Sequence, residues 1–416
     1  MDTQLQLLRR LCNLTVFSAA EEDPVFTAFV EFLEHAAAPT AHAPAACARF
    51  CKALYCQGLT DNWSEYMTSL VLSMDTPCNY FASRDEALPP YLEEAARIDL
   101  EALSAAASLT PVEALSDVEL DGLHLPKWHA EPTDLEAVWF ERLSGIKQYG
   151  FGMFARYKMF HMELSDKADK GYVLEPAASP DTVSLEDLVG YELQRRQVID
   201  NTRSLLNGYR ASNILLYGSA GTGKSATVKA VANAFASQGL RLIELSKNEL
   251  HLLPRLLEEL SENPLRFILF IDDLSFQEND DNFSALKAVL EGSISERSHN
   301  TVIYATSNRR HIVRETFSQR AGDEIHRNDT MQETISLSER FGIRVLFDKP
   351  NKELYLKIVS GLAQQYGLQA DPEELALEAE RFALRGSGRS ARAARQFVEQ
   401  MVACSSETKE GVNSEC

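Results

Sequence analysis

One glycine-rich stretch constrains this chain more than any other feature. Leu215 to Phe235 reads "LLYGSAGTGKSATVKAVANAF", and residues 218–225 match the pattern GxxxxGK[ST] in full. An apolar run typical of a strand precedes the glycines, and a run typical of a helix follows them. A strand, a tight loop and a helix in that order form the loop that surrounds phosphate groups with backbone N–H donors. The chain must therefore contain a parallel α/β sheet with a phosphate-binding loop.

The eight residues of this loop each have an expected task in binding a nucleotide. They are Gly218, Ser219, Ala220, Gly221, Thr222, Gly223, Lys224 and Ser225. The glycines let backbone N–H groups turn towards the phosphates, and the helix N-terminus adds its positive dipole end. We expect Lys224 to reach the β- and γ-phosphates of ATP and Ser225 to offer its hydroxyl to Mg²⁺. The alternative is a chance glycine-rich turn, which the flanking strand and helix disfavour.

A second polar site is expected at the end of another apolar run. "FILFIDD" ends in Asp272 and Asp273, and ligands of α/β proteins bind at the carboxyl ends of strands. We expect Asp272 to hold Mg²⁺ through water and Asp273 to orient or deprotonate the attacking water. The alternative is a solvated turn that happens to carry two acids.

Five short apolar runs define the expected sheet. They cover residues 213–218, 240–245, 266–273, 301–308 and 343–347. Helical stretches separate them, and strands that alternate with helices form a parallel sheet covered on both faces. The predicted fold class is α/β, as a three-layer αβα sandwich with a five-stranded parallel sheet.

Composition and periodicity divide the chain into five segments. Alanine, leucine and glutamate at helical spacing predict an all-helical N-terminal domain, and a polar, turn-rich stretch predicts a linker. Ser184 and Asp187 predict a helix start at the beginning of the α/β domain. The predicted segments are a helical domain at 1–165, a linker at 166–183, the α/β domain at 184–348, a helical lid at 349–404 and a disordered tail at 405–416.

Charge and cysteine usage narrow the possible partners and location. The formal net charge of -20 disfavours wrapping by nucleic acid, which needs concentrated lysine and arginine. No run is long and apolar enough to span a membrane, and the first residues do not read as a secretory signal. The odd number of cysteines, seven, fits a reducing cytosol. Cys47 and Cys51 share a helical face, and we favour buried thiols over metal ligands there.

Two segments leave room for nucleic-acid contact. Residues 139–162 are rich in aromatic residues with interleaved Lys and Arg, a pattern that suits either packing against a neighbouring element or base stacking. We favour packing. A stripe of arginines near the C-terminus suits either a solvated face or phosphate contact, and it consists of Arg381, Arg385, Arg389, Arg392 and Arg395.

The region from 184 to 403 resembles the AAA+ superfamily of P-loop ATPases. Beside Lys224 and Asp272, "TVIYATSN" ends in Asn308, which resembles the sensor-1 position near the γ-phosphate. "SLSERFGIRVLF" places Arg340 as in the arginine finger of these proteins, which acts in the site of a neighbouring subunit. Arg392 resembles the sensor-2 arginine, with Arg389 as the alternative. The segment around Leu188, Val189 and Gly190 resembles the part that packs near the adenine.

More narrowly, three stretches resemble a bacterial AAA+ family known mainly as a domain of unknown function and related to initiator and helicase-loader ATPases. The stretches read "FIDDLSFQENDDNFSALKAVLEGS", "ATSNRRHIVRE" and "LSERFGI". This narrower resemblance implies a fold and an ATP site, and no substrate. The first functional hypothesis is an AAA+ ATPase that binds ATP with Mg²⁺, assembles as a homo-oligomer, and remodels or loads a protein or nucleoprotein partner through the N-terminal domain.

Two departures from the AAA+ pattern shape the functional hypotheses. Many AAA+ ATPases carry glutamate where this chain has Asp273, and the shorter side chain predicts slow hydrolysis. The stretch before Asp272 lacks an aromatic-hydrophobic-glycine pore loop, so we do not expect threading of polypeptides. The alternative to an ATPase is a nucleotide-dependent binding switch that hydrolyses little. A small-molecule kinase ranks below both, because no acceptor site is visible.

Overall fold

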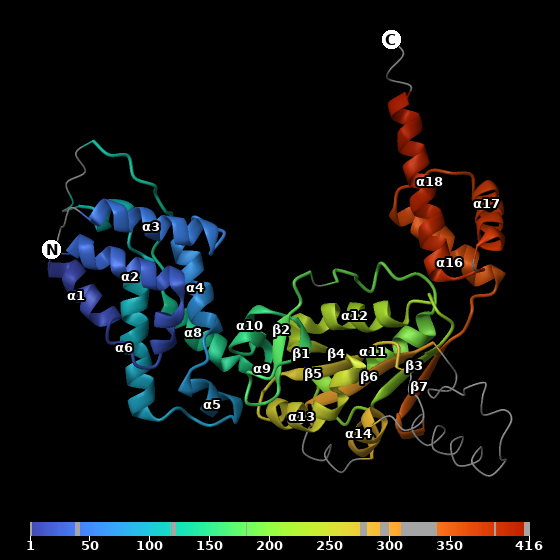
Figure 1. Ribbon diagram of the computed structural model, residues 1–416, viewed down its shortest axis with the longest axis horizontal. Coiled ribbons are helices and arrows are strands. Elements are labelled where there is room, and N and C mark those ends of the chain that lie inside the picture. Colours follow the sequence, from blue (N-terminus) through green and yellow to red (C-terminus); the bar gives the residue numbers. More distant parts are fainter. Residues whose placement is uncertain are drawn as a thin grey trace. The chain divides into compact units, whose positions relative to one another are not determined.

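The computed structural model describes most of the chain, and it divides into two compact units (Figure 1). The units are Met1–Arg156 and Tyr157–Cys416. The described residues are 2–37, 42–116, 118, 122–179, 181–274, 281–291, 299–308, 339–386 and 388–411. Each unit is taken by itself below.

The first unit is helical in the residues that the structure describes. Its elements are α1 (Asp2–Leu11), η1 (Ser18–Glu22), α2 (Pro24–Ala37), α3 (Ala43–Cys56), α4 (Trp63–Ser73), α5 (Pro77–Ser83), α6 (Pro90–Ala107), α7 (Pro111–Ala114), α8 (Leu135–Ser144), α9 (Ile146–Tyr149) and α10 (Met153–Arg156). Aromatic rings fill its core: Phe29 lies 4.5 Å from Trp63 and Phe50 lies 5.1 Å from Trp128, between ring centroids. Large buried aromatic surfaces of this kind supply most of the hydrophobic stabilisation of a helical domain.

Two predictions about side chains in this unit can be compared with the structure. Cys47 and Cys51 are buried in α3 without a disulfide, as the thiol interpretation expected. Among the described residues no cluster of His, Cys, Asp and Glu is suited to a metal ion. Trp139, in the aromatic stretch 139–162, is buried in α8 and packs edge-on against Phe17. The packing interpretation therefore holds for this residue.

A buried carboxylate joins α6 to the segment that follows α1. Asp99 is 3% exposed, and its Oδ2 accepts hydrogen bonds from the backbone N–H groups of Thr15, Val16 and Phe17 at 2.8, 2.7 and 3.1 Å. Three donors that converge on one charged oxygen compensate the cost of removing that charge from water. Asp99 thereby fixes the path of the chain between α1 and η1.

The second unit contains a seven-stranded sheet in the order β2-β1-β4-β5-β6-β3-β7. Its strands are β1 (Met159–Leu164), β2 (Tyr172–Pro176), β3 (Ile214–Gly218), β4 (Leu240–Leu245), β5 (Arg266–Ile271), β6 (Thr301–Ser307) and β7 (Ile343–Phe347). The five predicted strands are β3 to β7, and they pair in parallel. The predicted α/β fold is confirmed, with two strands more than expected.

The two additional strands lie in residues predicted to end the helical domain and to form the linker. β1 and β2 are antiparallel, with Leu164 opposite Tyr172, and β1 continues the sheet in parallel beside β4. The polar residues between them, 165–171, connect a hairpin. Short strands with one buried face carry a weak apolar signal, and turn residues look the same in a hairpin loop and in a linker.

Helices cover both faces of the sheet, as expected for parallel strands. Figure 1 shows α11 (Glu192–Leu206) and α12 (Lys224–Phe235) on one face, and α13 (Leu253–Ser261) and α14 (Asp281–Leu290) on the other. Short 3-10 helices, η2 (Ala236–Gln238) and η3 (Lys247–Leu252), flank β4. The buried faces of β3, β5 and β6 consist almost entirely of apolar residues.

The C-terminal part of the unit is a three-helix lid of α16 (Lys352–Gln365), α17 (Pro372–Arg385) and α18 (Ala391–Gly411). Tyr355, Ile358 and Phe397 are buried at its centre. α18 continues to Gly411, so part of the predicted tail at 405–416 is helical, whereas residues 412–416 lie outside the described residues. A polar composition does not prevent a helix from extending once its first turns are packed.

The expected helix start at Ser184 also needs correction. Ser184 N donates to Asp187 Oδ2 at 2.7 Å and Asp187 N donates to Ser184 Oγ at 3.2 Å, which is the reciprocal pattern of a capping box. The helix α11 nevertheless begins at Glu192. Gly190 and Tyr191 both have positive φ, at 79° and 58°, and this backbone conformation interrupts a helix.

Within the described part of the chain, the helices are all too short or too polar to pass through a lipid bilayer.

The Asp99 contacts generate a stability prediction. Asp99→Ala leaves the buried N–H groups of Val16 and Phe17, and the partly buried one of Thr15, without their acceptor, so the free energy of unfolding of the first unit should fall by about 2 to 3 kcal/mol. All three tryptophans, Trp63, Trp128 and Trp139, belong to this unit, so urea denaturation followed by tryptophan fluorescence of the full chain reports on it alone.

The matched control for this prediction is Glu101→Ala in the same helix. Glu101 is 71% exposed in its side chain and pairs with Arg10, and an exposed ion pair contributes less than about 1 kcal/mol. Equal shifts of the urea midpoint in the two variants would contradict the role assigned to Asp99.

Candidate functional site

The glycine-rich loop lies between β3 and α12, at the carboxyl end of a strand that lies between β6 and the edge strand β7. Gly218, Gly221 and Gly223 have φ angles of 129°, 71° and 93°, which L side chains rarely adopt. A Cβ on Gly218 would lie 2.2 Å from the carbonyl oxygen of Phe347, and Ser219 N donates to that oxygen at 3.0 Å. The end of β7 therefore passes so close to the loop that only glycine fits at 218.

Lys224 is held in place at the start of α12. Its side chain is buried, and Nζ donates to the carbonyl oxygens of Gly218 and Ser219 at 3.2 and 2.7 Å and to Asn308 Oδ1 at 2.9 Å. Burial lowers the pKa of Lys224 to about 8. The nearby carboxylates of Asp272 and Asp273 have the opposite, smaller effect and raise this pKa. The ammonium group thus lies between the loop and the polar ends of β5 and β6.

The two predicted acids follow β5 and contact the loop helix and β6. Ser225 Oγ donates to Asp272 Oδ1 at 2.6 Å, and Asn308 Nδ2 donates to Asp273 Oδ1 at 2.8 Å. Because β6 lies between β3 and β5 in the sheet, Asn308 reaches both Lys224 and Asp273. The structure therefore brings together all five side chains that the sequence singled out for this end of the site.

Thr306 is a contact residue that the sequence analysis missed. Its buried hydroxyl donates to Asp272 Oδ1 and accepts the backbone N–H of Asp273 at 2.9 Å. It lies inside the apolar run "TVIYATSN", and threonine is common in strands, so its residue type gives no signal of a special role. The available signal was its position two residues before Asn308, which puts both side chains on the same face of the strand.

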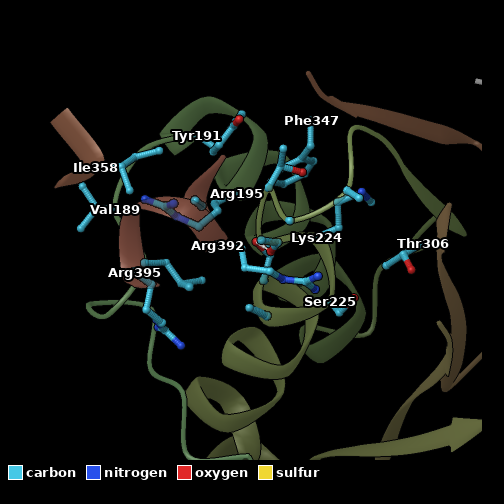
Figure 2. A pocket seen from close by; sticks show the side chains of 18 of the residues that line it. Val189, Tyr191, Arg195, Lys224, Ser225, Thr306, Phe347, Ile358, Arg392 and Arg395 are labelled. Atoms are coloured by element: carbon cyan, nitrogen blue, oxygen red, sulfur yellow. Dashed lines mark hydrogen bonds between the residues drawn. The ribbon is translucent and has the colours of Figure 1, made fainter. Parts of the chain in front are cut away.

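A cavity of about 520 Å³ extends from the loop to the lid. Figure 2 shows Lys224, Ser225 and Arg392 at one end of it and Val189 and Ile358 at the other. The lining residues are Asp187, Leu188, Val189, Tyr191, Arg195, residues 220–227, Asp272, Asp273, Thr306, Asn308, Phe347, Ile358, Leu362, Ala391, Arg392 and Arg395. One end is thus charged and rich in backbone N–H groups, and the other end is largely apolar.

The apolar end is built from the segment before α11 and from the lid helix α16. A Cβ on Gly190 would lie 3.0 Å from Ile358, so the segment presses closely against α16. Tyr191 donates through its hydroxyl to the carbonyl of Asp348 at 2.7 Å, and Arg195 donates to the carbonyl of Gly190. Val189 and Gly190 are therefore fixed beside the cavity, as the sequence expected, whereas Tyr191 and Arg195 were not anticipated.

The lid arginines have different surroundings. The backbone N–H of Arg392 donates to the carbonyl of Gly221 at 3.0 Å, and its side chain lines the cavity. Arg389 instead forms a two-pronged ion pair with Glu380, at 2.8 and 2.7 Å, and that pair lowers the pKa of Glu380. Of the two alternatives, the structure brings Arg392 to the cavity.

The arginine stripe is not one continuous face. α17 ends at Arg385 and α18 begins at Ala391, so the five arginines belong to two helices and the connection between them. Arg381 pairs with Glu378, and Arg389 pairs with Glu380. Arg392 and Arg395 line the cavity. This arrangement gives little support to a phosphate-backbone contact along the stripe.

Arg340 lies outside the cavity lining. It precedes β7 and forms an ion pair with Glu291 in the same chain. A role for Arg340 in the site of a neighbouring subunit stays a prediction.

The donor set near the loop suits Mg²⁺. The Ser225 hydroxyl and the Asp272 carboxylate are oxygen groups, contact each other at 2.6 Å and lie at the charged end of the cavity. Mg²⁺ prefers oxygen ligands, keeps several of its waters, and is bound by one or two protein side chains together with substrate phosphates.

Comparison with known proteins assigns the chain to a family. Residues 157–405, more than half of the chain, match the family described as "Protein of unknown function (DUF815)", and the chain belongs to that family. The match begins where the second compact unit begins. The first unit lies outside it.

One curated relative and several solved structures share part of the chain. "ORC1-type DNA replication protein 14" of Haloarcula marismortui is 44% identical over 70 residues, which are 17% of this chain and 15% of the relative. The predicted resemblance to initiator-related AAA+ ATPases is confirmed by this relative together with the family. The chain thus spans a small part of the relative's length.

Two solved structures of RuvB from Thermotoga maritima align with 52% of this chain and 63% of their own. A single-residue variant gives a TM-score of 0.37 at 15% identity. The structure described as the "RuvB Holliday junction branch migration motor" gives 0.35 at 16%.

The contact between Gly218 and Phe347 generates a prediction about local stability. Gly218→Ala adds a Cβ against a backbone carbonyl in an unfavourable φ region, and should destabilise the β3–β7 pair by about 3 to 5 kcal/mol. Hydrogen exchange of peptides that cover β3 and β7 measures this change directly.

Gly223→Ala is the control, because it shares the positive φ but has no atom within 4 Å of the added Cβ. Its cost should be only about 1 to 2 kcal/mol of backbone strain. Equal exchange in the two variants would show that β7 moves aside without cost.

Proposed function

We propose that this member of the DUF815 family is an AAA+ ATPase that binds ATP with Mg²⁺ in the cavity and hydrolyses it. The observation that carries the proposal is the contact set of Lys224, which joins a complete phosphate-binding loop to Asn308 and lies beside Asp272 and Asp273. A cavity of about 520 Å³ is within the usual size range of small-molecule sites. The similarity to the ORC1-type DNA replication protein supports the same activity.

The charged end would hold the triphosphate. Backbone N–H groups of residues 219–225 and the N-terminus of α12 offer donors and a positive dipole end to the phosphates. Lys224 would exchange its carbonyl and amide partners for phosphate oxygens. Ser225 and Asp272 would hold Mg²⁺, which when bound supplies positive charge that offsets the charge on the phosphates.

The apolar end would hold the base. Val189 on one side and Ile358 and Leu362 on the other line this end of the cavity with apolar side chains. Buried contacts of this type fix the orientation of a ligand while the polar groups at the other end determine its class.

Asp273 and Asn308 would act on the attacking water. Asp273 would accept the proton, and a role for Asn308 beside it is supported by its hydrogen bonds to both Asp273 and Lys224. Arg392 from the lid would stabilise the negative charge that develops on the phosphoryl oxygens. Arg340 of a neighbouring subunit would do the same across an interface, which implies a homo-oligomer.

A specific contact favours slow turnover and keeps the switch as a second candidate. Asp273 is one methylene shorter than glutamate, and its Oδ1 already accepts a hydrogen bond from Asn308 at 2.8 Å. A carboxylate that is shorter and already held by Asn308 reaches a bound water less readily than a glutamate carboxylate. A protein with this arrangement would bind ATP tightly, alter its affinity for a partner and hydrolyse little.

The work that ATP performs would involve the first unit. We propose a cytosolic machine whose helical unit engages a protein or nucleoprotein partner, which the ATPase unit remodels or loads. The net charge of -20 favours a protein as the direct contact over bare nucleic acid.

ATP turnover per subunit as a function of protein concentration tests the proposal. For a shared site, turnover should rise with concentration, because Arg340 completes the site of its neighbour only in the assembled state. Lys224→Ala should reduce turnover to background at every concentration. Arg340→Ala should remove the rise with concentration, so that its turnover is about 100-fold or more below that of the unmodified protein where the unmodified protein is assembled.

Three outcomes can be told apart in this experiment. Tight ATP binding with turnover at the Lys224→Ala level would favour the switch. Turnover that does not change with protein concentration, and that is the same in Arg340→Ala, would contradict a site shared between subunits. The absence of nucleotide binding would overturn the function as a whole.

A second prediction separates the two lid arginines. Arg392→Ala removes a guanidinium at the charged end of the cavity and should lower turnover about 10- to 100-fold. Arg389→Ala breaks a pair with Glu380 outside the cavity lining and should leave turnover within about threefold of the unmodified protein. Steady-state turnover at saturating ATP measures both, and the opposite order would assign the role to Arg389.

A further inference from the structure

We propose that Thr306 is a positioning residue that orients both acids of the site, Asp272 for Mg²⁺ and Asp273 for water. The inference rests on the proposed ATPase function and adds a residue to it. Thr306 belongs neither to the glycine-rich loop nor to the acids, and its hydroxyl is engaged by Asp272 and by the backbone of Asp273.

The hydroxyl of Thr306 is used in both directions. The residue is 2% exposed, its Oγ1 donates to Asp272 Oδ1, and the same oxygen accepts the backbone N–H of Asp273 at 2.9 Å. A hydroxyl has a single hydrogen to donate, so its donation to Asp272 and its acceptance from Asp273 fix its rotation. One side chain therefore links the side chain of the first acid to the backbone of the second.

The first consequence concerns the carboxylate of Asp272. Three donors converge on its Oδ1: the hydroxyls of Thr306 and Ser225 and, at 3.1 Å, the backbone N–H of Asp273. These contacts hold the carboxylate in one orientation. Oδ2 has no hydrogen-bond partner among the described residues, which leaves it for a water bound to Mg²⁺. Residues that orient a metal-binding carboxylate change metal affinity even though they do not touch the ion.

The second consequence concerns the backbone of Asp273. This residue has a φ of 49°, in the left-handed region that non-glycine residues rarely adopt. Two oxygens of Thr306 hold this turn. The side-chain Oγ1 accepts the N–H of Asp273, and the backbone carbonyl accepts the N–H of Leu274 at 2.7 Å. The unusual backbone directs the Asp273 side chain towards Asn308.

A purely structural role is the competing explanation. A buried threonine in a strand fills a volume that valine fills equally well, and the loss of its hydrogen bonds would only lower stability. The two explanations predict different metal affinities after the hydroxyl is removed. A residue that only fills a volume leaves metal affinity unchanged, whereas a residue that orients a carboxylate lowers metal affinity when it is lost.

The experiment compares Thr306→Val, Thr306→Ser and a matched control, Thr202→Val. Thr202 is a fully buried threonine of the same unit whose hydroxyl bonds the carbonyl of Val198 and the hydroxyl of Tyr304, away from the cavity lining. Each protein is titrated with a fluorescent ATP analogue in EDTA. A separate sample without EDTA is titrated with Mn²⁺ in the presence of that analogue, and bound Mn²⁺ is read by electron paramagnetic resonance against a titration of the analogue alone. Thermal unfolding is recorded in parallel.

The expected result is a selective loss of metal binding. Thr306→Val should bind the analogue in EDTA within about twofold of the unmodified protein and bind Mn²⁺ about 10- to 100-fold more weakly. Thr306→Ser keeps the hydroxyl and should restore Mn²⁺ affinity to within about threefold. Thr202→Val should lose thermal stability without a change in Mn²⁺ affinity.

Each other outcome overturns a distinct statement. Unchanged Mn²⁺ affinity in Thr306→Val, with stability lowered as in Thr202→Val, would reduce Thr306 to a structural residue. Failure of Thr306→Ser to restore metal binding would show that the methyl group, and not the hydroxyl, matters. If Thr306→Val does not fold, Thr306→Ala replaces it in the same comparison. If the unmodified protein binds no analogue at all, the proposed function fails before the variants are compared.

Discussion

The close approach of β7 to the glycine-rich loop organises the second unit. The carbonyl of Phe347 accepts the N–H of Ser219 at 3.0 Å, and this distance is possible only because residue 218 has no side chain. The next carbonyl along the chain, that of Asp348, accepts the hydroxyl of Tyr191. Two consecutive carbonyls thus join the phosphate-binding loop, the segment beside the apolar end of the cavity and the connection to the lid. A cavity with one charged and one apolar end follows from these contacts.

Strand order explains why polar residues from distant parts of the sequence meet. β6 lies between the strand that leads into the loop and the strand that ends in the two acids. The last residues of β6 therefore face both neighbours, which is why Asn308 contacts Lys224 and Asp273 while Thr306 contacts Asp272. Successive side chains of a strand point to opposite faces of the sheet. A shift of β6 by one residue along its neighbours would therefore turn these side chains to the opposite face.

The sequence predicted the parts of this unit that depend on local pattern. The loop, the five apolar runs and the acids after "FILFI" could be read directly, because glycines, apolar strands and terminal carboxylates are local signals. Thr306, Tyr191 and Arg195 could not, because their importance arises from strand order and from a bend at Gly190. The hairpin of β1 and β2 was missed for a related reason: strands at an edge carry a weak apolar pattern, and pairing with β4 stabilises them. The helix start at Ser184 was wrong because two left-handed residues follow the cap.

The backbone contact between Arg392 and Gly221 has a mechanical consequence. It anchors the first turn of α18 to the glycine-rich loop, and α18 is 21 residues long. At 1.5 Å per residue the helix extends over roughly 30 Å. A tilt of about ten degrees at the anchored turn would displace the far end by about 5 Å, whereas the loop itself would move by a fraction of that distance. A small rotation at the glycine-rich loop is therefore converted into a much larger displacement at the far end of α18.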